Sequence, residues 1–276
     1  MHIIPKQKTI SPRGRVFGRP LRAVVAALFN PLHYLSIVRS SVYENVLDSF
    51  FKRYVLGRGD YPYSCLLRTP SGVLAADAYS HYDMLTINEI FTWKCYANER
   101  SAKIVVDFGS NIGISVLYFI CLNPESFVYA YEPLATNCIK LRKNLSAFSS
   151  RYNLIEAAVC TYHGQVDFAV ESTGRYSGIG LKHSNIEKVA CVDARQVIKD
   201  VVSEHGKIDI LKVDIEGAER DIFQQMDPEV LSNVEKIYIE SDDFDVSLLV
   251  SMGYLHKRHP SGVHHFSKSN IDEKLS

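Results

Sequence analysis

The chain has 276 residues, of which 46% are hydrophobic and 22% charged, a composition typical of a globular protein that can bury a full core. Lysine plus arginine and aspartate plus glutamate each number 31, so no net charge would attract nucleic acid, and a broad nucleic-acid-binding role is disfavoured. We expect one main domain over residues 99–276, preceded by an N-terminal extension over residues 1–98.

The first residues are basic and lead into an apolar stretch, residues 21–38. Asn30, Pro31 and His33 interrupt that stretch, whereas a membrane-spanning helix needs about 20 apolar residues without such breaks. A secretory signal would have a shorter basic region and a small-residue cleavage site. Two alternatives remain: a basic amphipathic helix on an anionic membrane surface, at the inner face of the membrane, or a helix that packs on the rest of the chain. The cations are Lys6, Lys8, Arg13, Arg15, Arg19 and Arg22.

The rest of the extension is expected to form a cap or lid beside the main domain. One helix is predicted over residues 20–55. Ser64–Arg68 and Val73–Ala76 are predicted strands on either side of the turn Thr69–Gly72, whose proline and glycine favour a hairpin. Glu89–Tyr96 is then expected to be helical.

From about residue 100, short β-branched runs alternate with segments that carry apolar residues at helical spacing. Such alternation predicts βαβ units, and therefore an α/β, Rossmann-like, doubly wound and mostly parallel sheet. Gly253–Leu255 with Val263–Phe266 would add an antiparallel terminal strand, and Gly164–Val170 is predicted to be an extra strand. The predicted sheet strands are Lys103–Phe108, Phe127–Tyr131, Leu154–Val159, Ile208–Val213 and Lys236–Glu240. The predicted helices are Ile112–Cys121, Leu134–Phe148, Ala194–Val202 and Ala218–Met226.

The six cysteines lie singly, without the paired spacing that a zinc site or a redox dithiol requires. Several lie in apolar runs, where a buried reduced thiol is expected. We therefore expect a cytoplasmic protein without disulfides. The residues are Cys65, Cys95, Cys121, Cys138, Cys160 and Cys191.

A glycine-containing loop, Asp107–Gly113, lies where the first strand of the sheet is predicted to end and a helix to begin. Glycine lets the backbone turn sharply and approach a ligand closely, and N–H groups at a helix start can bind a carboxylate or phosphate. A side chain at Gly109 is therefore expected to block a ligand while leaving the fold intact. Such turns are common, so the loop alone only suggests a binding site.

Glu132 strengthens that suggestion, because it stands at the end of the second predicted strand, about two dozen positions after Gly109. An acidic side chain at this place can accept hydrogen bonds from both hydroxyls of an adenosine ribose. Pro133 would end the strand and leave the carboxylate at the C-terminal edge of the sheet.

A third signal is the block Leu211–Glu219, at the end of the fourth predicted strand. Ligands of open α/β sheets lie outside the carboxyl ends of the strands, so Asp214 and Glu216 are expected to face the crevice beside Gly109. Glu219 is better explained as an acid favoured at a helix start.

Together these segments resemble the FkbM-type methyltransferase family. The resemblance rests on the glycine and asparagine positions of Asp107–Gly113, on Tyr131–Pro133 with Asn137, and on the Leu211–Glu219 block. It covers roughly residues 80–245.

The resemblance implies S-adenosylmethionine as methyl donor and, as acceptor, a hydroxyl of a sugar, polysaccharide, polyketide or other secondary metabolite. The family loop usually has smaller residues where Phe108 and Ser110 stand, but neither change removes a backbone donor. The cofactor-binding residues are expected to be Asp107, Gly109, Ser110, Asn111, Gly113, Glu132, Asn137 and Asp214.

Methyl transfer to an alcohol needs a positioned base or a bound cation, because an alcohol is a poor nucleophile. The acids predicted nearest to the reacting methyl group, and therefore the candidate catalytic residues, are Asp214, Glu216 and Glu240. Asp214, Glu240 and Asp242 could instead hold Mg²⁺. The favoured interpretation is that no metal is bound and that the acidic run after Glu240 is a solvated loop.

Other interpretations remain open at this point. A histidine near the terminal hairpin could be the base, although alternation puts His264 and His265 on opposite sides of their strand. An NAD(P)-dependent oxidoreductase would share the glycine loop and the ribose-binding acid, but it would not explain the Leu211–Glu219 block. A membrane-surface binding protein would use the basic N-terminus, and a homo-oligomer is compatible with the sequence.

Overall fold

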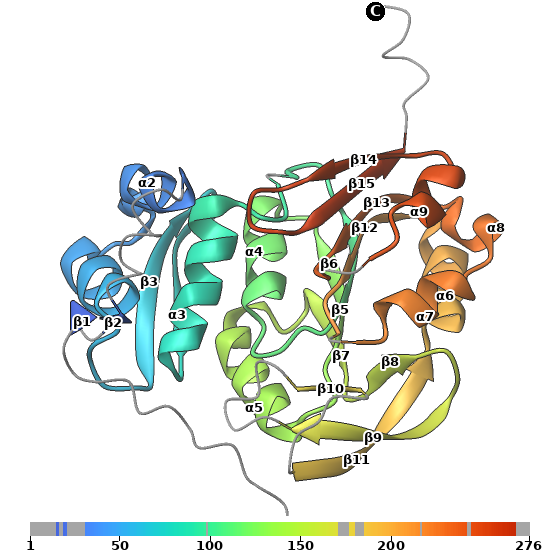
Figure 1. Ribbon diagram of the computed structural model, residues 1–276, viewed down its shortest axis with the longest axis horizontal. Helices are drawn as coiled ribbons and strands as arrows, with labels where there is room; N and C mark the ends of the chain where they lie inside the picture. The colour runs from blue at the N-terminus through green and yellow to red at the C-terminus, as the bar shows by residue number, and fades with distance from the viewer. Residues whose placement is uncertain are drawn as a thin grey trace, which may run out of the picture.

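The structure is a computed structural model that describes residues 15–16, 19–20, 31–97, 99–170, 177–179, 185–215, 217–241 and 244–268 (Figure 1). Two predicted site residues, Glu216 and Asp242, lie outside these ranges. At the start, β1 (Arg15–Val16) pairs with β2 (Arg19–Pro20). No helix in the described ranges is long and apolar enough to cross a membrane.

A seven-stranded sheet with the order β14-β15-β13-β12-β5-β6-β7 forms the centre of the molecule. Its neighbours are parallel except where β15 runs antiparallel to both β13 and β14, as predicted. The central strands are nearly continuous apolar runs because helices cover both faces. The strands are β5 (Ile104–Phe108), β6 (Phe127–Tyr131), β7 (Tyr152–Ile155), β12 (Ile208–Val213), β13 (Val234–Ile239), β14 (Tyr254–Arg258) and β15 (His264–Lys268).

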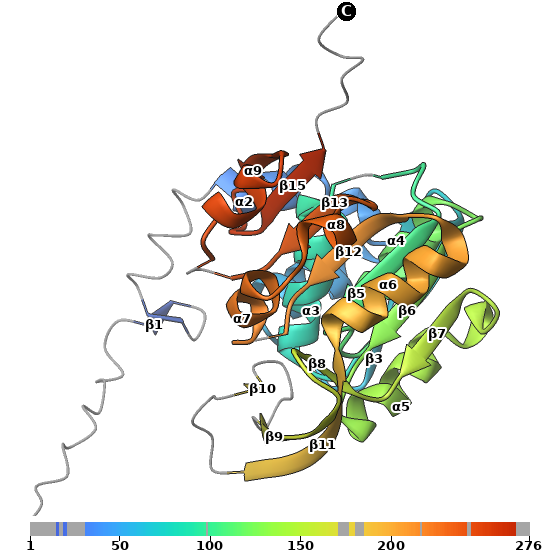
Figure 2. The same ribbon diagram turned by 90° about the vertical axis from the view of Figure 1, so that its right-hand side faces the viewer.

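The two faces of the sheet carry separate hydrophobic clusters, because successive side chains of a strand point to opposite faces. Val105 packs in one cluster with α4, α5 and the N-terminal extension, whereas Val106 packs in the other with α6 to α9. Figures 1 and 2 show these helices on either side of the strands. The helices are α4 (Ile114–Leu122), α5 (Ala135–Asn144), η4 (Ser146–Phe148), α6 (Ala194–His205), α7 (Glu219–Gln224), α8 (Pro228–Leu231) and α9 (Ser247–Ser251).

A second sheet, with the order β10-β9-β11-β8, lies beside the C-terminal ends of the central strands. The prediction of one strand over Leu154–Val159 is wrong, because β7 pairs with β6 in the main sheet while β8 pairs with β11 in the second. Both halves of that segment are apolar, so the sequence pattern does not mark the change of partner. The second sheet contains β8 (Ala158–Cys160), β9 (Gly164–Val170), β10 (Gly178–Ile179) and β11 (Asn185–Asp193).

The N-terminal extension is built from short helices and the predicted hairpin. The single helix expected over residues 20–55 is wrong, because the chain leaves helical geometry at Tyr43, which bridges to Leu67 of the hairpin. Asn45 then caps the start of η2, which is a π-helix: its side chain accepts a hydrogen bond from the Asp48 N–H. The elements are α2 (Pro31–Val38), η1 (Ser40–Val42), η2 (Val46–Val55), β3 (Tyr63–Thr69), β4 (Gly72–Ala78), α3 (His81–Asn88) and η3 (Glu89–Trp93).

The extension shares a hydrophobic core with the main sheet. Tyr43 and Phe50 of the extension belong to the same buried cluster as Leu117 of α4. Phe91 of η3 meets Tyr118 of α4 edge to face, with 5.3 Å between ring centroids. The extension is therefore packed against α4, and its segment from α3 to Tyr96, called the cap below, lines a cavity together with the ends of the central strands. All six cysteines are buried free thiols.

Candidate functional site

The ends of β5 and β12 touch at Gly109. The Asp214 N–H donates a hydrogen bond of 3.1 Å to the Phe108 carbonyl, and a Cβ at Gly109 would lie 1.8 Å from the Asp214 carbonyl oxygen. Gly109 also has a φ of +81°, a conformation that favours glycine. The expectation that a side chain at Gly109 leaves the fold intact is therefore wrong, because the clash is with the chain's own backbone.

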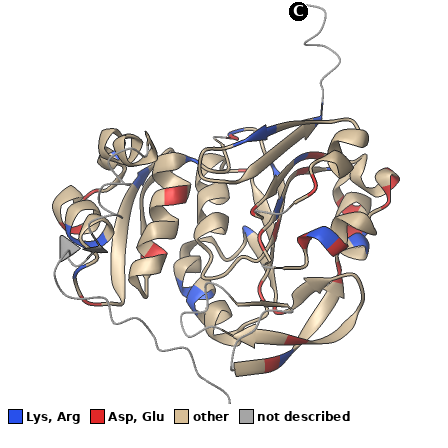
Figure 3. Cartoon of the chain, in the orientation of Figure 1, with Lys and Arg blue, Asp and Glu red and all other residues tan. Residues whose placement is uncertain are grey.

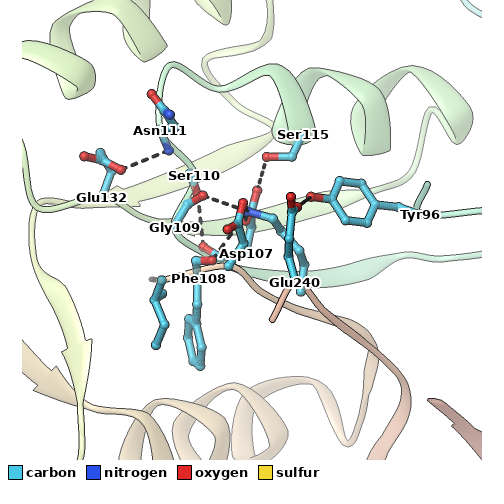
Figure 4. Close-up of polar contacts among 12 residues, drawn as sticks. Tyr96, Asp107, Phe108, Gly109, Ser110, Asn111, Ser115, Glu132 and Glu240 are labelled. Atoms are coloured by element: carbon cyan, nitrogen blue, oxygen red, sulfur yellow. Dashed lines mark hydrogen bonds and ion pairs between the residues drawn. The ribbon is translucent and has the colours of Figure 1, made fainter. Parts of the chain in front are cut away.

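The loop after Gly109 is held by Glu132 at the end of β6 (Figure 4). Asn111 lies in the left-handed region with a φ of 47°, and its N–H donates a hydrogen bond of 3.0 Å to Glu132 Oε2. Glu132 Oε1 accepts from the Leu134 N–H at 3.0 Å and from the Asn137 amide at 3.1 Å. Asn137 thus orients Glu132.

Glu132 is a buried carboxylate whose ionisation is shifted. Burial raises the pKa of Glu132 to about 7, although the hydrogen bonds from Leu134, Asn137 and Asn111 favour the charged form. A carboxylate offers about four acceptor positions, and the described residues fill three of them, which leaves one on Oε2. Glu132 also lines a cavity.

Two cavities meet at the Gly109 and Asp214 contact. The smaller one lies between Glu132, the turn from β7 to β8 and the second sheet, which contributes Phe168 and Ile179. This contribution was not predicted from the sequence, because β9 was expected only as an extra strand, without a partner sheet. The smaller cavity is lined by Gly109, Asn111, Tyr131, Glu132, Pro133, Leu134, Ala157, Ala158, Val159, Phe168, Ser177, Ile179, Asp214 and Ile215.

The larger cavity, of about 250 Å³, lies between the cap and the ends of the central strands. It shares Gly109, Asn111 and Asp214 with the smaller one. Its lining residues are Asp83, Thr86, Glu89, Ile90, Cys95, Tyr96, Gly109, Ser110, Asn111, Ile112, Ile114, Ser115, Lys212, Asp214 and Glu240. The cap residues among them were not predicted as site residues, because helical spacing alone does not say what a helix faces.

Lys212 is the central cation of this region and was not predicted as a site residue. Its ammonium lies 3.0 Å from Asp107 Oδ1 and 3.4 Å from Asp214 Oδ2, and it donates to the Gly109 carbonyl at 2.7 Å. Burial lowers the pKa of Lys212, but the Asp107 and Asp214 carboxylates outweigh it and leave that pKa raised. A lysine inside an apolar strand, two residues before Asp214, was a signal that the sequence did contain.

Asp107 is fully buried and lines neither cavity among the described residues. Its Oδ2 accepts a hydrogen bond of 2.5 Å from the Ser115 hydroxyl on α4, and its Oδ1 faces Lys212 (Figure 4). The structure thus gives Asp107 a supporting position beneath the loop. Its direct contact with a cofactor stays a prediction.

Asp214 and Glu240, two predicted catalytic acids, lie at the ends of neighbouring strands. The Glu240 N–H donates to the Val213 carbonyl at 3.0 Å, and both side chains line the larger cavity. Glu240 Oε2 accepts a long hydrogen bond of 3.4 Å from the Tyr96 hydroxyl of the cap. The structure therefore brings together the two strand ends that the sequence analysis selected.

The remaining predicted residues support the site in different ways. Ser110 lines the larger cavity, whereas Gly113 lets α4 approach α5, since a Cβ there would lie 2.9 Å from Leu141 Cγ. Glu219 is buried and accepts hydrogen bonds from the Ile215 and Gly217 N–H groups, as suits an acid at a helix start.

Two alternatives from the sequence, a histidine base and a bound metal ion, receive no support from the geometry of the described residues. His264 and His265 do face opposite sides of β15, as predicted, with contacts to His256 and to the Cys95 carbonyl respectively. Neither lines the two cavities. Across the described ranges, no three His, Cys, Asp or Glu side chains form a group that could hold a metal ion.

Comparison with known proteins agrees with the geometry. The sequence profile of the methyltransferase FkbM domain matches residues 107–257. The chain is 24% identical over 216 residues to the 31-O-demethyl-FK506 methyltransferase FkbM of Streptomyces tacrolimicus, covering 66% of this chain and 83% of that protein. It is 24% identical over 215 residues to the AMB antimetabolite synthetase AmbE of Pseudomonas aeruginosa, covering 63% of this chain.

A crystal structure of methyltransferase FkbM from Methylobacillus flagellatus superposes with a TM-score of 0.45 at 15% identity, covering 67% of this chain. The chain spans 10% of AmbE and 54% of the Methylobacillus protein. The profile match includes the glycine loop, Glu132 and the Leu211–Glu219 block, which each contribute residues to the lining of the cavities. The chain therefore belongs to the FkbM methyltransferase family.

Proposed function

We propose that the chain is an S-adenosylmethionine-dependent O-methyltransferase that acts on a hydroxyl of a sugar, polysaccharide, polyketide or other secondary metabolite. The observation that carries the proposal is the meeting of two cavities at Gly109 and Asp214. The family implies the methyl donor, and the name of the Streptomyces relative, a 31-O-demethyl-FK506 methyltransferase, supports an oxygen acceptor.

The residues of the smaller cavity fit the donor. Glu132 keeps one acceptor position for a ribose hydroxyl, and Phe168 and Ile179 supply apolar walls for a flat base. Gly109 allows a close backbone approach, and Asp214 provides a carboxylate where the cavities join, which suits a cationic group. S-adenosylmethionine, when bound, supplies a methyl group on a positively charged sulfur.

The larger cavity would receive the acceptor. In the reaction, a carbon–oxygen bond forms as the carbon–sulfur bond breaks, and the hydroxyl proton must leave. Asp214 and Glu240 both line this cavity and are the carboxylates placed to take that proton. The Lys212 ammonium, 3.4 Å from Asp214 Oδ2, orients that carboxylate. The cap limits entry of water and holds the acceptor near the strand ends.

Replacement of Asp214 by asparagine tests this assignment. Asp214→Asn preserves size, so the fold should be retained, while turnover should fall by about 10²-fold, as for the loss of a general base. Affinity for S-adenosylmethionine should change little. The measurement is S-adenosylhomocysteine release with a panel of hydroxyl acceptors, together with donor affinity by calorimetry.

Glu240→Gln is the matched variant, since it removes the carboxylate at the end of the neighbouring strand.

Chelation by EDTA distinguishes a side-chain base from a bound metal ion, because only a metal ion predicts lost activity that Mg²⁺ restores. Normal turnover of Asp214→Asn on an accepted substrate would show that Asp214 is not catalytic.

We also place the protein in the cytoplasm. The six buried free thiols are consistent with a reducing compartment.

A further inference from the structure

The backbone at the end of the cap is held in an unusual conformation. The chain leaves helical geometry at Lys94, which has a φ of 58°, and Ala97 has a φ of 57°. This left-handed conformation is unfavourable for residues other than glycine, so it persists only where surrounding contacts impose it. Cys95 and Tyr96, which line the larger cavity, lie between these two residues.

Two of the contacts come from histidines of the terminal hairpin β14–β15. His265 Nε2 lies 2.6 Å from the Cys95 carbonyl oxygen, which can only accept, so the ring donates through Nε2. His259, in the turn of the hairpin, forms a hydrogen bond with the backbone of Trp93. Its Nδ1 accepts from the Ser261 N–H at 3.1 Å, so the proton of the neutral His259 ring is on Nε2.

The rings of His259 and His265 lie against each other. Their centroids are 5.6 Å apart and the angle between their planes is 9°. A positive charge on one ring therefore disfavours a positive charge on the other. Protonation of His259 at Nδ1 would also remove the acceptor for the Ser261 N–H. This geometry favours two neutral rings.

The surroundings of the pair favour the neutral form as well. Burial lowers the pKa of both rings, which is the largest effect, although their backbone hydrogen bonds raise it. Arg39 lowers the pKa of His259 further, and His256 lowers that of His265. Lys94 lies close enough to Arg39 that its own pKa is lowered by burial and by that charge.

The remaining charged groups around His265 act in both directions. Lys257, its partner across the hairpin, belongs to a basic stretch that Figure 3 shows in blue on β14. Glu99 favours a charge on His265, but its carboxylate already binds Lys236 at 2.5 Å and accepts from the Tyr238 hydroxyl at 3.2 Å. The result is a lowered pKa for His265 as for His259.

Tyr96 connects the held backbone to the proposed catalytic acids. Its hydroxyl donates to Glu240 Oε2 at 3.4 Å, and its ring packs on Tyr238 with 5.8 Å between centroids. Tyr238 in turn meets the His265 ring edge to face at 4.7 Å. A shift of Cys95 would therefore move Tyr96 and change its contact with Glu240.

We propose that His259 and His265 are positioning residues for the acceptor side of the site. In their neutral forms they hold the backbone at Trp93 and Cys95 and thereby keep Tyr96 beside Glu240, and uptake of a proton by the pair weakens this hold. The proposal rests on the proposed function in treating the larger cavity as the acceptor side.

The direction of the pH dependence follows from the lowered pKa values. A histidine in the released segment has the ordinary pKa of about 6.5, whereas the held form resists protonation. The hold is therefore fully present above about pH 6.5 and is lost as the pH falls through the lowered values of His259 and His265.

The test is amide hydrogen exchange of the full chain without ligand, from pH 7.5 to pH 5.5, with each rate divided by the intrinsic rate at that pH. We expect the corrected exchange of Cys95–Ala97 to rise as the pH falls, on the order of tenfold for each unit by which the fold lowers the pKa. Constant exchange over this range would overturn the proposal.

Two substitutions of His265 separate the hydrogen bond from the charge. His265→Phe keeps a ring against Tyr238 but has no donor, so exchange of Cys95–Ala97 should be fast even at pH 7.5. His265→Gln keeps an N–H donor and cannot take up a proton, so exchange should stay slow at pH 7.5. Exchange in His265→Phe as slow as in the unmodified chain would overturn the proposal.

The double variant His259→Gln with His265→Gln should lose the pH response and serves as the decisive variant if His265→Phe does not fold. His256→Gln is the matched control: His256 belongs to the same hairpin but pairs with His264 on the other side, so the response should remain. A response that persists in the double variant would assign it to other groups and overturn the proposal.

Titration with S-adenosylhomocysteine and turnover of a hydroxyl acceptor distinguish this proposal from the proposed function. His265→Phe should leave donor affinity unchanged and raise the acceptor KM, and His265→Gln should restore that KM. Loss of donor affinity instead would overturn the assignment to the acceptor side. If the unmodified chain does not bind S-adenosylhomocysteine, the proposed function fails, while the exchange measurement still decides whether the histidines hold the segment.

Discussion

Glu132 illustrates how a single residue couples loop geometry to ligand binding. Its carboxylate accepts the Asn111 N–H, so the residue that would receive the ribose also fixes the glycine loop. The sequence identified Glu132 from its place at a strand end. It could not identify the degree of burial, which comes from the packing of Leu134 and the second sheet around it.

The raised pKa of Glu132, about 7, makes donor affinity depend on pH. A ribose hydroxyl donates to the charged carboxylate, so binding should favour ionisation and weaken about tenfold for each pH unit below 7, with a plateau above it. Calorimetry with S-adenosylhomocysteine from acid to alkaline pH measures this profile.

Glu132→Gln should flatten the profile and cost on the order of 1.5 to 3 kcal/mol of affinity above pH 7, the range for hydrogen bonds to a charged group. Glu156→Gln is the control, because this nearby acid is 44% exposed and paired with Arg142. An unchanged dissociation constant in Glu132→Gln would contradict the ribose assignment.

At the scale of elements, Lys212 links the ends of β5 and β12. Asp107 is completely buried, so its charge depends on the Lys212 ammonium 3.0 Å away. Lys212→Met should therefore lower the free energy of unfolding by about 3 to 5 kcal/mol, as expected when one partner of a buried ion pair is removed. Urea denaturation measures the change.

The double variant Lys212→Met with Asp107→Asn distinguishes charge from packing. It should recover a large part of the loss, because no unpaired charge remains. A loss below about 1 kcal/mol in the single variant would contradict a stabilising role of the Lys212–Asp107 ion pair.

Several elements were predictable because their signal is local. Phe127–Tyr131, Ile208–Val213 and Gly164–Val170 have the predicted bounds, since each is a short apolar or alternating run ended by a turn residue. The hairpin β3–β4 was predicted, and each of its four strand ends extends one or two residues beyond the predicted bound. Local pattern and local structure agree in these cases.

Other elements depend on contacts that the sequence does not display. The strand β11 was not predicted, because its first four residues are exposed and three of them are polar, and it is defined by pairing with β9 and β8. The break at Tyr43 depends on pairing with the hairpin. The same limit applies to the site: strand-end acids were predictable, but the cap and second-sheet walls were not.

At the scale of the whole molecule, the charge is unevenly distributed. Residues 1–30 contain six of the 31 cations and no acids, so the rest of the chain has six more acids than cations. Residues beyond 30 belong to the fold, since Tyr43 and Phe50 lie in the shared core. The basic segment can therefore be removed at residue 30 without cutting that core.

We expect the full chain to sediment with vesicles that contain phosphatidylserine, through attraction between these cations and the anionic surface. Deletion of residues 1–30 or high salt should abolish binding, while neutral vesicles should bind neither form. If the deleted and full chains sediment equally with anionic vesicles, residues 1–30 do not provide a membrane contact.

We propose that the two cavities hold S-adenosylmethionine and an acceptor rather than a nicotinamide cofactor. Calorimetric titration of the full chain with S-adenosylhomocysteine and, separately, with NADH tests it most directly. We predict saturable binding of S-adenosylhomocysteine with one site per chain and no comparable binding of NADH. Absence of S-adenosylhomocysteine binding, or tighter binding of NADH, would contradict the account.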